Sequence, residues 1–243
     1  VINELRSEIN NALKPALQRH QASYVGDSYI SDSWIDDIKA QLEGLKTKAD
    51  AFGLFASSLA EKVIGLANGI NKRQLTSQLK NNIGLDIYSS DALIEPFIEA
   101  KIQENAGLIK SIPQKYLDNV SSIVYQGVSQ GLTSKRIAQD INEQHKVATR
   151  RAEFIARDQM AKINASITQK RQESLGISKY IWSNSQDQRV RGNPSGKYPN
   201  AKHNHWMLEG KVVSWSSPPR ESGYNHPGQD FRCRCIAKPI IEI

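Results

Sequence analysis

The sequence has little sulfur and no long apolar segment. Its 243 residues include only two cysteines and two methionines, and no uninterrupted apolar run approaches the roughly 18–20 residues that a membrane-spanning helix needs. The most apolar segment, residues 53–70, is interrupted by Glu61 and Lys62. It is therefore predicted to be an amphipathic helix, and we expect no membrane partner. No secretory leader is evident in the sequence, which begins at Val1 rather than at a methionine.

Positive charge is scarce in the first part of the chain and abundant in the last. Residues 1–145 contain 15 Lys and Arg against 17 Asp and Glu, whereas residues 146–243 contain 17 against 8. The formal net charge of +7 therefore arises from the second part. This asymmetry indicates a basic region that works near a polyanion, with nucleic acid as the first expectation. The alternative is a surface whose charge only provides solubility.

The first part of the chain is predicted to be helical. Between residues 31 and 67, apolar side chains recur every three or four residues and would share one helical face. The clearest members of this stripe are Trp34, Ile35, Ile38, Leu42 and Leu45. Gly53, Gly65 and Gly69 are expected to weaken or break the run, and a shorter helix is expected over residues 72–81.

Further helices are predicted in the middle of the chain. Pro113 suits the first turn of a helix that Gly131 ends, and the Thr-Ser pair at residues 133–134 begins the next one. The longest helix is expected over residues 147–175, with Gly176 as a C-terminal residue that tolerates left-handed geometry.

Three arginines of this longest helix are candidate contacts for DNA phosphates. The buried face of the helix is predicted to be a stripe of Ala and Ile side chains. Arg150, Arg151 and Arg171 are expected to bind DNA without sequence specificity if they lie on the opposite, exposed face.

After Gly176 the period of the sequence changes from helix to strand. Residues 179–185 and 210–215 read as strands, and residues 235–241 read as a third, in which Pro239 restricts the strand to an edge or an end. Turn-rich loops connect these segments. The predicted fold class is α+β: a mostly α-helical N-terminal region followed by a long helix and a small loop-rich β-module.

Chemically distinctive side chains gather between Tyr180 and Cys235. Three of the five histidines, three of the four tryptophans and both cysteines lie here. Thiolates and imidazoles together suit Zn²⁺. The predicted ligands of a closed zinc site are His205, His226, Cys233 and Cys235. A single C-x-C lacks the two spaced pairs of a strong zinc motif, so two buried packing thiols are the alternative. A disulfide across this spacing would be difficult to close.

Charged residues follow the first predicted strand. Asp187, Arg189 and Arg191 are expected to form an ion-pair network in which Asp187 fixes an arginine and caps the turn. The alternative is that a planar guanidinium binds a phosphate or a carboxylate directly. The tryptophans of this region are expected to form its core rather than a stacking platform for bases.

Several motifs follow one another in a specific order over roughly residues 106–238. They are LIKSIPQKYLDNVSSIVYQGVSQGLTSKRIAQDI, RRAEFIARDQMAKINA, W-x-x-S-x-D-x-R-V-R, HWMLEG, H-P-G-x-D and a closing C-R-C. This order resembles the Mu F-like phage head morphogenesis, or minor head protein, family. The positions that carry the resemblance are Arg157, Trp182, Asp187, Arg189, Arg191, His205, Gly210, Pro227 and Asp230. In the family, a threonine and a glutamate follow the helix arginine, whereas here Asp158 and Gln159 follow Arg157.

The resemblance implies a low-copy protein of the bacteriophage virion, made in the host cytoplasm and assembled into the head near the portal. Family members are linked to head assembly and to the state or ejection of packaged DNA. The expected partners are the portal protein, a capsid or scaffold protein, and packaged double-stranded DNA. Residues 1–105 are predicted to be a helical arm that docks to portal or capsid, and residues 106–243 the Mu F-like module.

No enzymatic activity is expected, because no nuclease or hydrolase motif is complete. The alternative is a metal-dependent enzyme or toxin-like effector that acts on nucleic acid or a nucleotide. Its candidate site would combine Asp187, His203, His205 and Glu209.

Overall fold

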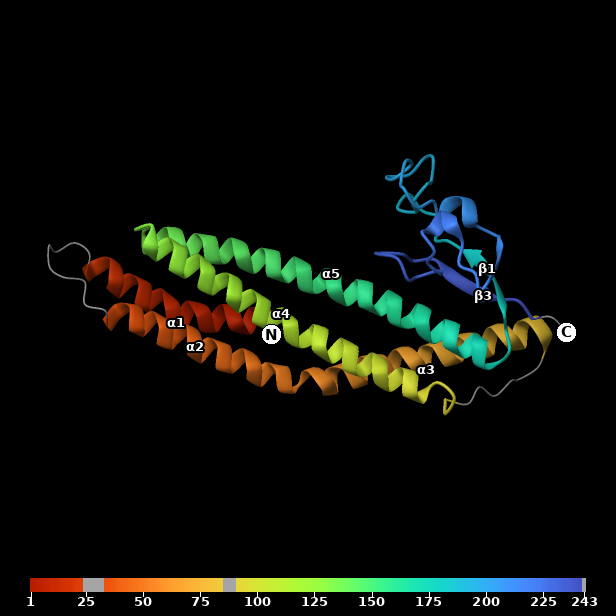
Figure 1. The fold of residues 1–243 in the computed structure, drawn as a ribbon, viewed down its shortest axis with the longest axis horizontal. Helices are drawn as coiled ribbons and strands as arrows, with labels where there is room; N and C mark the ends of the chain where they lie inside the picture. Colours follow the sequence, from red (N-terminus) through yellow and green to blue (C-terminus); the bar gives the residue numbers. More distant parts are fainter. Residues whose placement is uncertain (24–32, 85–90, 242–243) are drawn as a thin grey trace. The chain divides into compact units, whose positions relative to one another are not determined.

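Helices form most of the described structure. The computed structural model describes residues 1–23, 33–84 and 91–241. Its helices are α1 (Ile2–Ser23), α2 (Ser33–Leu54), α3 (Ala56–Ile83), α4 (Glu95–Ser129) and α5 (Ser134–Ser174) (Figure 1). Within these ranges, no helix combines the length and the apolar character needed to cross a membrane.

A three-stranded antiparallel sheet follows the helices. β1 (Lys179–Ser183) is central, and β2 (Val212–Ser214) and β3 (Ile236–Pro239) flank it. In the β1–β3 pair, Tyr180 lies opposite Pro239. Pro239 therefore lies in an edge strand, as predicted, because its missing N–H would interrupt a central ladder. The α+β fold class, with a mostly helical region before a small β-module, is confirmed.

Several predicted helix interruptions are wrong. Gly65 and Gly69 lie inside α3, and Pro113 lies inside α4. The helices predicted from residues 133–134 and from residue 147 are one continuous α5 of 41 residues. In each case buried apolar side chains continue on both sides of the interruption. Packing of a helix face outweighs the roughly 1 kcal/mol propensity loss of a glycine, and here also the larger loss at a proline.

Other predicted helix ends are confirmed. At the start of α5, the hydroxyl of Thr133 accepts the N–H of Arg136 at 3.2 Å, as an N-cap residue does. At its end, Gly176 has a φ of 75°. The N–H of Ile177 then donates to the carbonyl of Gln172 at 3.0 Å. A left-handed residue at this place satisfies carbonyls that the helix would otherwise leave unpaired.

The chain forms two compact units, and each unit is built from two segments that are separated in the sequence. The first unit comprises Val1–Ala60 and Gln103–Phe154. Its core is one apolar cluster contributed by α1, α2, α4 and α5. The members include Leu5, Ile9, Leu13, Leu17, Ile38, Leu42, Leu45, Tyr116, Leu117, Val120, Val124, Ile137, Ile141 and Ala148. Three members of the predicted α2 stripe are thus buried, whereas the side chains of Trp34 and Ile35 lie outside the described residues.

The second unit comprises Glu61–Ile102 and Ile155–Ile243. A helical cluster of Ile64, Ala67, Ile94, Ile163 and Ile167 forms one part of its core. The β-module forms another. The predicted boundary at residue 105 falls inside α4, and the assignment of separate roles to the two sides of that boundary stays a prediction.

Arg171 lies in the interior of the second unit, with 0% of its side chain exposed. Its guanidinium donates to the side chain of Asn68 and pairs with Asp91 at 2.7 Å. Lys72 pairs with the same carboxylate at 2.9 Å. Arg171 therefore does not fit the exposed position expected of a DNA contact, since its charge is already used to join α3, the turn before α4, and α5.

Gln172, the next residue of α5, fixes the helix to the β-module. Its side chain is fully buried. Its amide N–H donates to the carbonyl of Ala237 at 3.1 Å, and its amide oxygen accepts the indole N–H of Trp215 at 3.1 Å. Both the N–H and the oxygen of this buried carboxamide are hydrogen-bonded. The pairing fixes the position of α5 on the β-module, because a shift of the helix would leave these polar groups buried without partners.

The buried His145 is expected to make the first unit sensitive to acid. Its ring packs edge-on to Tyr116, with centroids 6.0 Å apart. Burial, together with the charge of Arg6, lowers the pKa of His145 below its ordinary 6.5. Below about pH 6.5 the unfolded chain takes up this proton more readily than the folded chain, so the free energy of unfolding should fall by at most about 1.4 kcal/mol per pH unit for this group. Urea denaturation at about pH 5 and about pH 7.5 measures the difference.

The matched variants are His145→Gln and His203→Gln. The first should flatten the acid dependence, because the titrating group is gone, and the second should leave the contribution of His145 in place. An acid loss as steep in His145→Gln as in the wild type would contradict the assignment.

Candidate metal centre and the motif cluster of the terminal module

Aromatic side chains of the sheet form the floor of the candidate site. Trp182 on β1 is completely buried in a cluster with Tyr180, Trp215 and both cysteines. The ring of His205 meets Trp182 edge-on, with centroids 5.4 Å apart. Two of the three tryptophans of the module therefore pack in its core, as predicted, whereas Trp206 is only partly buried and begins a short 3-10 turn.

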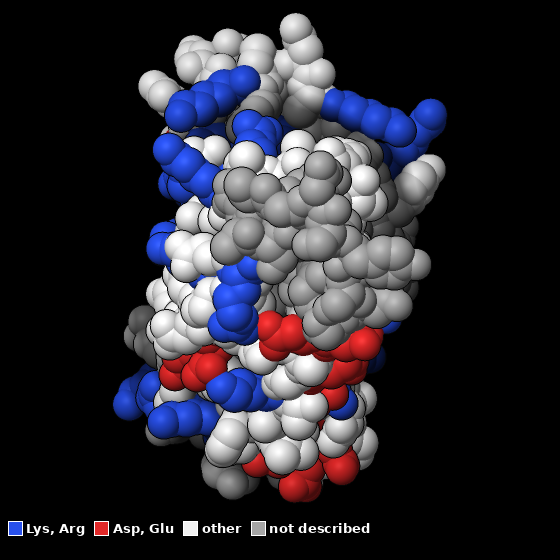
Figure 2. Space-filling view, turned by 90° about the vertical axis from the view of Figure 1, so that its left-hand side faces the viewer, with Lys and Arg blue, Asp and Glu red and all other residues white. Residues whose placement is uncertain are grey.

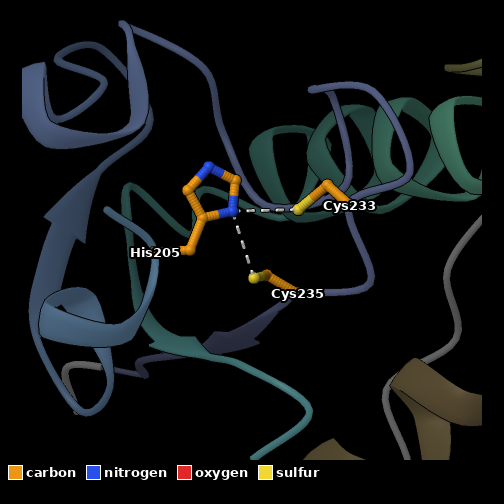
Figure 3. A group of neighbouring side chains, drawn as sticks. All are labelled: His205, Cys233 and Cys235. Carbon is orange, nitrogen blue, oxygen red and sulfur yellow. Dashed lines mark hydrogen bonds between the residues drawn. The ribbon is translucent and has the colours of Figure 1, made fainter. Parts of the chain in front are cut away.

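His205, Cys233 and Cys235 converge in a buried group. His205 precedes the 3-10 turn, and the cysteines lie in the segment that leads into β3. Nδ1 of His205 lies 3.5 Å from the sulfur of Cys233 and 3.6 Å from that of Cys235, and Figure 3 shows the imidazole directed at both. The exposed fractions are 3%, 5% and 7%. The possible ligand atoms all lie within 4.8 Å of one another, so this group could bind a metal such as zinc.

His226, the fourth predicted ligand, is used elsewhere. Its Nδ1 lies 2.8 Å from the hydroxyl of Tyr180, and its ring packs against Trp215 at 4.8 Å. Burial lowers the pKa of His226, which favours the neutral imidazole that accepts the tyrosine hydroxyl. Among the residues that the structure describes, the group that could hold an ion contains three side chains and not the predicted four.

The two thiols share a proton unequally. The pKa of Cys233 is lowered, chiefly by a hydrogen bond from Cys235 and against the effect of burial, with His205 as a further contribution. The pKa of Cys235 is raised, because its neighbour takes the negative charge first. The backbone N–H of Gly228 also donates to the sulfur of Cys233 at 3.3 Å. The pocket therefore favours a thiolate at Cys233, which is the form that binds metals.

Asp230 lies among three basic side chains. Its carboxylate pairs with Arg191, lies 3.3 Å from Nδ1 of His203, and lies 3.6 Å from Nε2 of His205. Burial alone would raise the pKa of Asp230, but the hydrogen bond with His203 and the charge of Arg191 bring it below its ordinary value. Arg191 also donates to the carbonyl of Phe231. Asp230 is therefore an anion that joins the R-V-R segment to the C-terminal loop.

A second ion-pair cluster surrounds Asp187. Both of its oxygens accept from the guanidinium of Arg234 at 2.6 Å, and one accepts the backbone N–H of Arg189 at 2.9 Å. The guanidinium of Arg234 is the main reason that the pKa of Asp187 is far below its usual range. Asp187 thus fixes an arginine and caps its own turn. The arginine with the bidentate contact is Arg234, the central residue of the closing C-R-C motif, whereas we expected Arg189 or Arg191 in this role.

The helix α5 contributes Asp158, a residue at which this chain departs from the family pattern. Asp158 is buried, and it accepts the backbone N–H of Arg232 at 2.9 Å. It also pairs with Lys162 at 2.7 Å, whose ammonium lies 4.4 Å from the ring centroid of Phe231. The signal was present in the sequence as the acid that directly follows Arg157. Arg157 itself is exposed.

Two glycines in turns of the module, Gly210 and Gly228, adopt left-handed backbone conformations that the fold requires. Gly210 has a φ of 73° and donates its N–H to the carbonyl of Trp182. Pro227 is buried beside Gly228, whose φ is 83°. A Cβ at Gly228 would lie 2.7 Å from the Cβ of Ala165 on α5, so only a glycine permits this approach of loop and helix.

The long helix, the three-stranded module and its buried His–Cys group can now be compared with known proteins. Residues 118–238 match the family described as Phage Mu protein F like protein. An uncharacterized protein of Haemophilus influenzae is 34% identical over an alignment of 240 residues that covers 96% of this chain. The chain spans about half, 50%, of that relative's length. No solved structure matches significantly.

Over residues 118–238, the chain belongs to the Phage Mu protein F-like family, as the order of its motifs predicted. The matched region includes all nine positions that carry the resemblance and the complete His205, Cys233 and Cys235 group. It is thus the family region of the chain that carries the candidate metal centre.

Replacing Gly228 by alanine is expected to lower the free energy of unfolding more than replacing Gly210. Both have left-handed backbone, but a Cβ at Gly210 would meet nothing within 4 Å. Gly210→Ala should therefore lower the free energy of unfolding by about 1 kcal/mol, from backbone strain alone. Gly228→Ala should lose roughly 1–3 kcal/mol more, because it also overpacks the contact with Ala165. Urea denaturation of both variants provides the comparison.

A third variant separates the two causes. Gly228→Ala combined with Ala165→Gly removes the clashing methyl group and should restore most of the excess loss, once the roughly 1 kcal/mol that a glycine costs inside α5 is subtracted with the single variant Ala165→Gly. Equal losses in the two single variants would show that the close approach of loop and helix does not limit position 228.

Proposed function

We propose that this protein is a phage minor head protein with a structural role in head assembly, at the portal or the inner capsid. The observation that carries the proposal is the family match over residues 118–238. Its support is that the C-terminal part of the matched region, within the second unit, brings motif residues into contact: Arg191 binds Asp230, and Asp230 lies beside His203 and His205. Side chains that are paired with one another in this way stabilise the fold of the module and are not available to act on a substrate.

We propose a structural rather than a catalytic use of the polar residues. Asp187 is held by Arg234 and by the backbone of Arg189, and Glu209 accepts the backbone N–H of Asn184. His205 is buried against two thiols. A hydrolytic site needs a base with access to substrate and water, which these environments do not favour. For the same reason we propose that the His205, Cys233 and Cys235 group binds Zn²⁺ as a structural ion.

We also propose that the basic part of the chain contacts packaged DNA. Residues 146–243 carry the excess of positive charge, and Arg150 and Arg151 on α5 are exposed. Lys and Arg side chains are exposed at many places on the face shown in Figure 2. Guanidinium groups of this kind bind phosphates without reading bases.

The first prediction concerns particles. If the protein has a role at the portal, it should be found at low copy number in virions produced from the genome that encodes it, and it should co-purify with the portal protein. Quantitative mass spectrometry of purified virions and procapsids measures both. Absence from virions and from procapsids alike would contradict the structural role.

The second prediction concerns DNA. The full chain should bind unrelated duplexes with similar affinity, and the affinity should fall steeply between roughly 50 and 200 mM salt as counterions are released. Arg150→Gln with Arg151→Gln should weaken binding and reduce the salt dependence by about two units of the logarithmic slope, one for each phosphate contact. Fluorescence anisotropy provides the titration.

The matched control is Lys39→Gln with Lys46→Gln in α2, which removes two exposed positive charges from the part of the chain with balanced charge. That variant should bind as the wild type does. If the wild type binds no DNA at low salt, the basic surface serves a protein partner instead and the DNA part of the proposal fails.

A further inference from the structure

In the candidate metal centre, the imidazole nitrogen lies at the distance from both sulfurs that a tetrahedral zinc site requires. With Zn–S bonds of about 2.3 Å and Zn–N bonds of about 2.0 Å, tetrahedral geometry separates a sulfur from a nitrogen by roughly 3.5 Å. Nδ1 of His205 lies 3.5 and 3.6 Å from the sulfurs of Cys233 and Cys235. An ion would therefore fit between these atoms with little movement of the chain.

The imidazole presents one nitrogen to the thiols and the other to a carboxylate. Nε2 of His205 is buried and has no hydrogen-bond partner among the described atoms. The nearest acid is Asp230, whose Oδ2 lies 3.6 Å away. When Nδ1 binds a metal, the proton of a neutral histidine must reside on Nε2, which then needs an acceptor. Histidines that bind metals usually donate this second N–H to a carboxylate or carbonyl.

The surroundings supply the remaining requirements of such a site. Gly228 donates its backbone N–H to Cys233 and so stabilises charge on that sulfur. A cavity of about 190 Å³ borders both cysteines, and its lining mixes apolar side chains with polar ones such as Asn71 and Gln172. Its volume has room for a water molecule as a fourth ligand on the cysteine side of the centre.

We propose that Zn²⁺ binds here through three side chains, His205, Cys233 and Cys235, with water as the fourth ligand, and that Asp230 is a positioning residue that holds the imidazole from its far side. His226 is not a ligand. This inference rests on the zinc-binding part of the proposed function and is independent of the role in the phage head. Through Asp230 the ion is joined to Arg191, so the site couples the R-V-R segment to the C-terminal cysteines.

Metal content and X-ray absorption of the purified full chain test the ligand set. The wild type should carry about one zinc per chain, with two sulfur and two lighter ligands, one of them an imidazole. Cys233→Ser, Cys235→Ser and His205→Gln should lose zinc, whereas His226→Gln should keep it. No zinc in the wild type would overturn both the zinc proposal and this inference. One zinc with two imidazole ligands, or its loss in His226→Gln, would overturn the inference alone.

The role of Asp230 is tested by zinc affinity against a competing chelator. Asp230→Asn should weaken zinc binding about 10–100-fold, the usual effect of losing an outer carboxylate. Arg191→Gln is the matched control, because it breaks the same ion pair but leaves the carboxylate beside His205, and its affinity should stay near that of the wild type. Equal losses in the two variants would show that Asp230 acts only by holding Arg191, and would overturn its positioning role.

A spectroscopic measurement keeps the test decisive if a variant folds poorly. Cobalt-substituted wild type should show thiolate-to-metal charge-transfer absorption and the intense visible bands of a tetrahedral ion. Asp230→Asn should retain these bands at saturating cobalt, because it keeps all three ligands, while Cys235→Ser should lose charge-transfer intensity. Octahedral cobalt spectra in the wild type would contradict the proposed site.

Discussion

The contact of His205 with two thiols on one side and a carboxylate on the other holds the terminal module together. The module has strands of only five, three and four residues, so the apolar area that its sheet can bury is small. Links between polar side chains supply the rest. Through Cys235, His205 reaches β3, and through Asp230 it reaches the segment that contains Arg191. Segments far apart in the sequence therefore meet at one imidazole.

The sequence was sufficient for features that depend on local chemistry. The three strands, the edge position of Pro239, and the end of α5 at Gly176 all follow from the backbone preferences of a few residues. The continuity of the helices was not predictable in this way. A glycine or a proline weakens a helix by a known amount, but whether buried neighbours outweigh that loss depends on which other helices cover them. Gly65 and Pro113 lie inside helices for this reason.

In the candidate site, too, residue types were predictable from the sequence, whereas the pairing of side chains depends on the folded chain. Residue types indicated that histidine and cysteine would meet, and His205, Cys233 and Cys235 do meet. The sequence could not choose between His226 as a ligand and His226 as the partner of Tyr180, because both uses suit a buried imidazole. Arg171 was wrongly predicted to be exposed, because a charged side chain on a long helix usually faces solvent. Only the position of Asp91 in the folded chain explains its burial.

The outer edge of β3 is protected against the addition of a further strand. An open sheet edge is a template on which another chain can add a strand. Here Pro239 offers no N–H, and the carbonyl of Ala237 is already taken by Gln172 of α5. Strand addition at this edge is therefore disfavoured, because one donor is missing and one acceptor is already occupied. A chain that binds beside β3 therefore has to rely on side-chain contacts, which can form and release without changing the sheet.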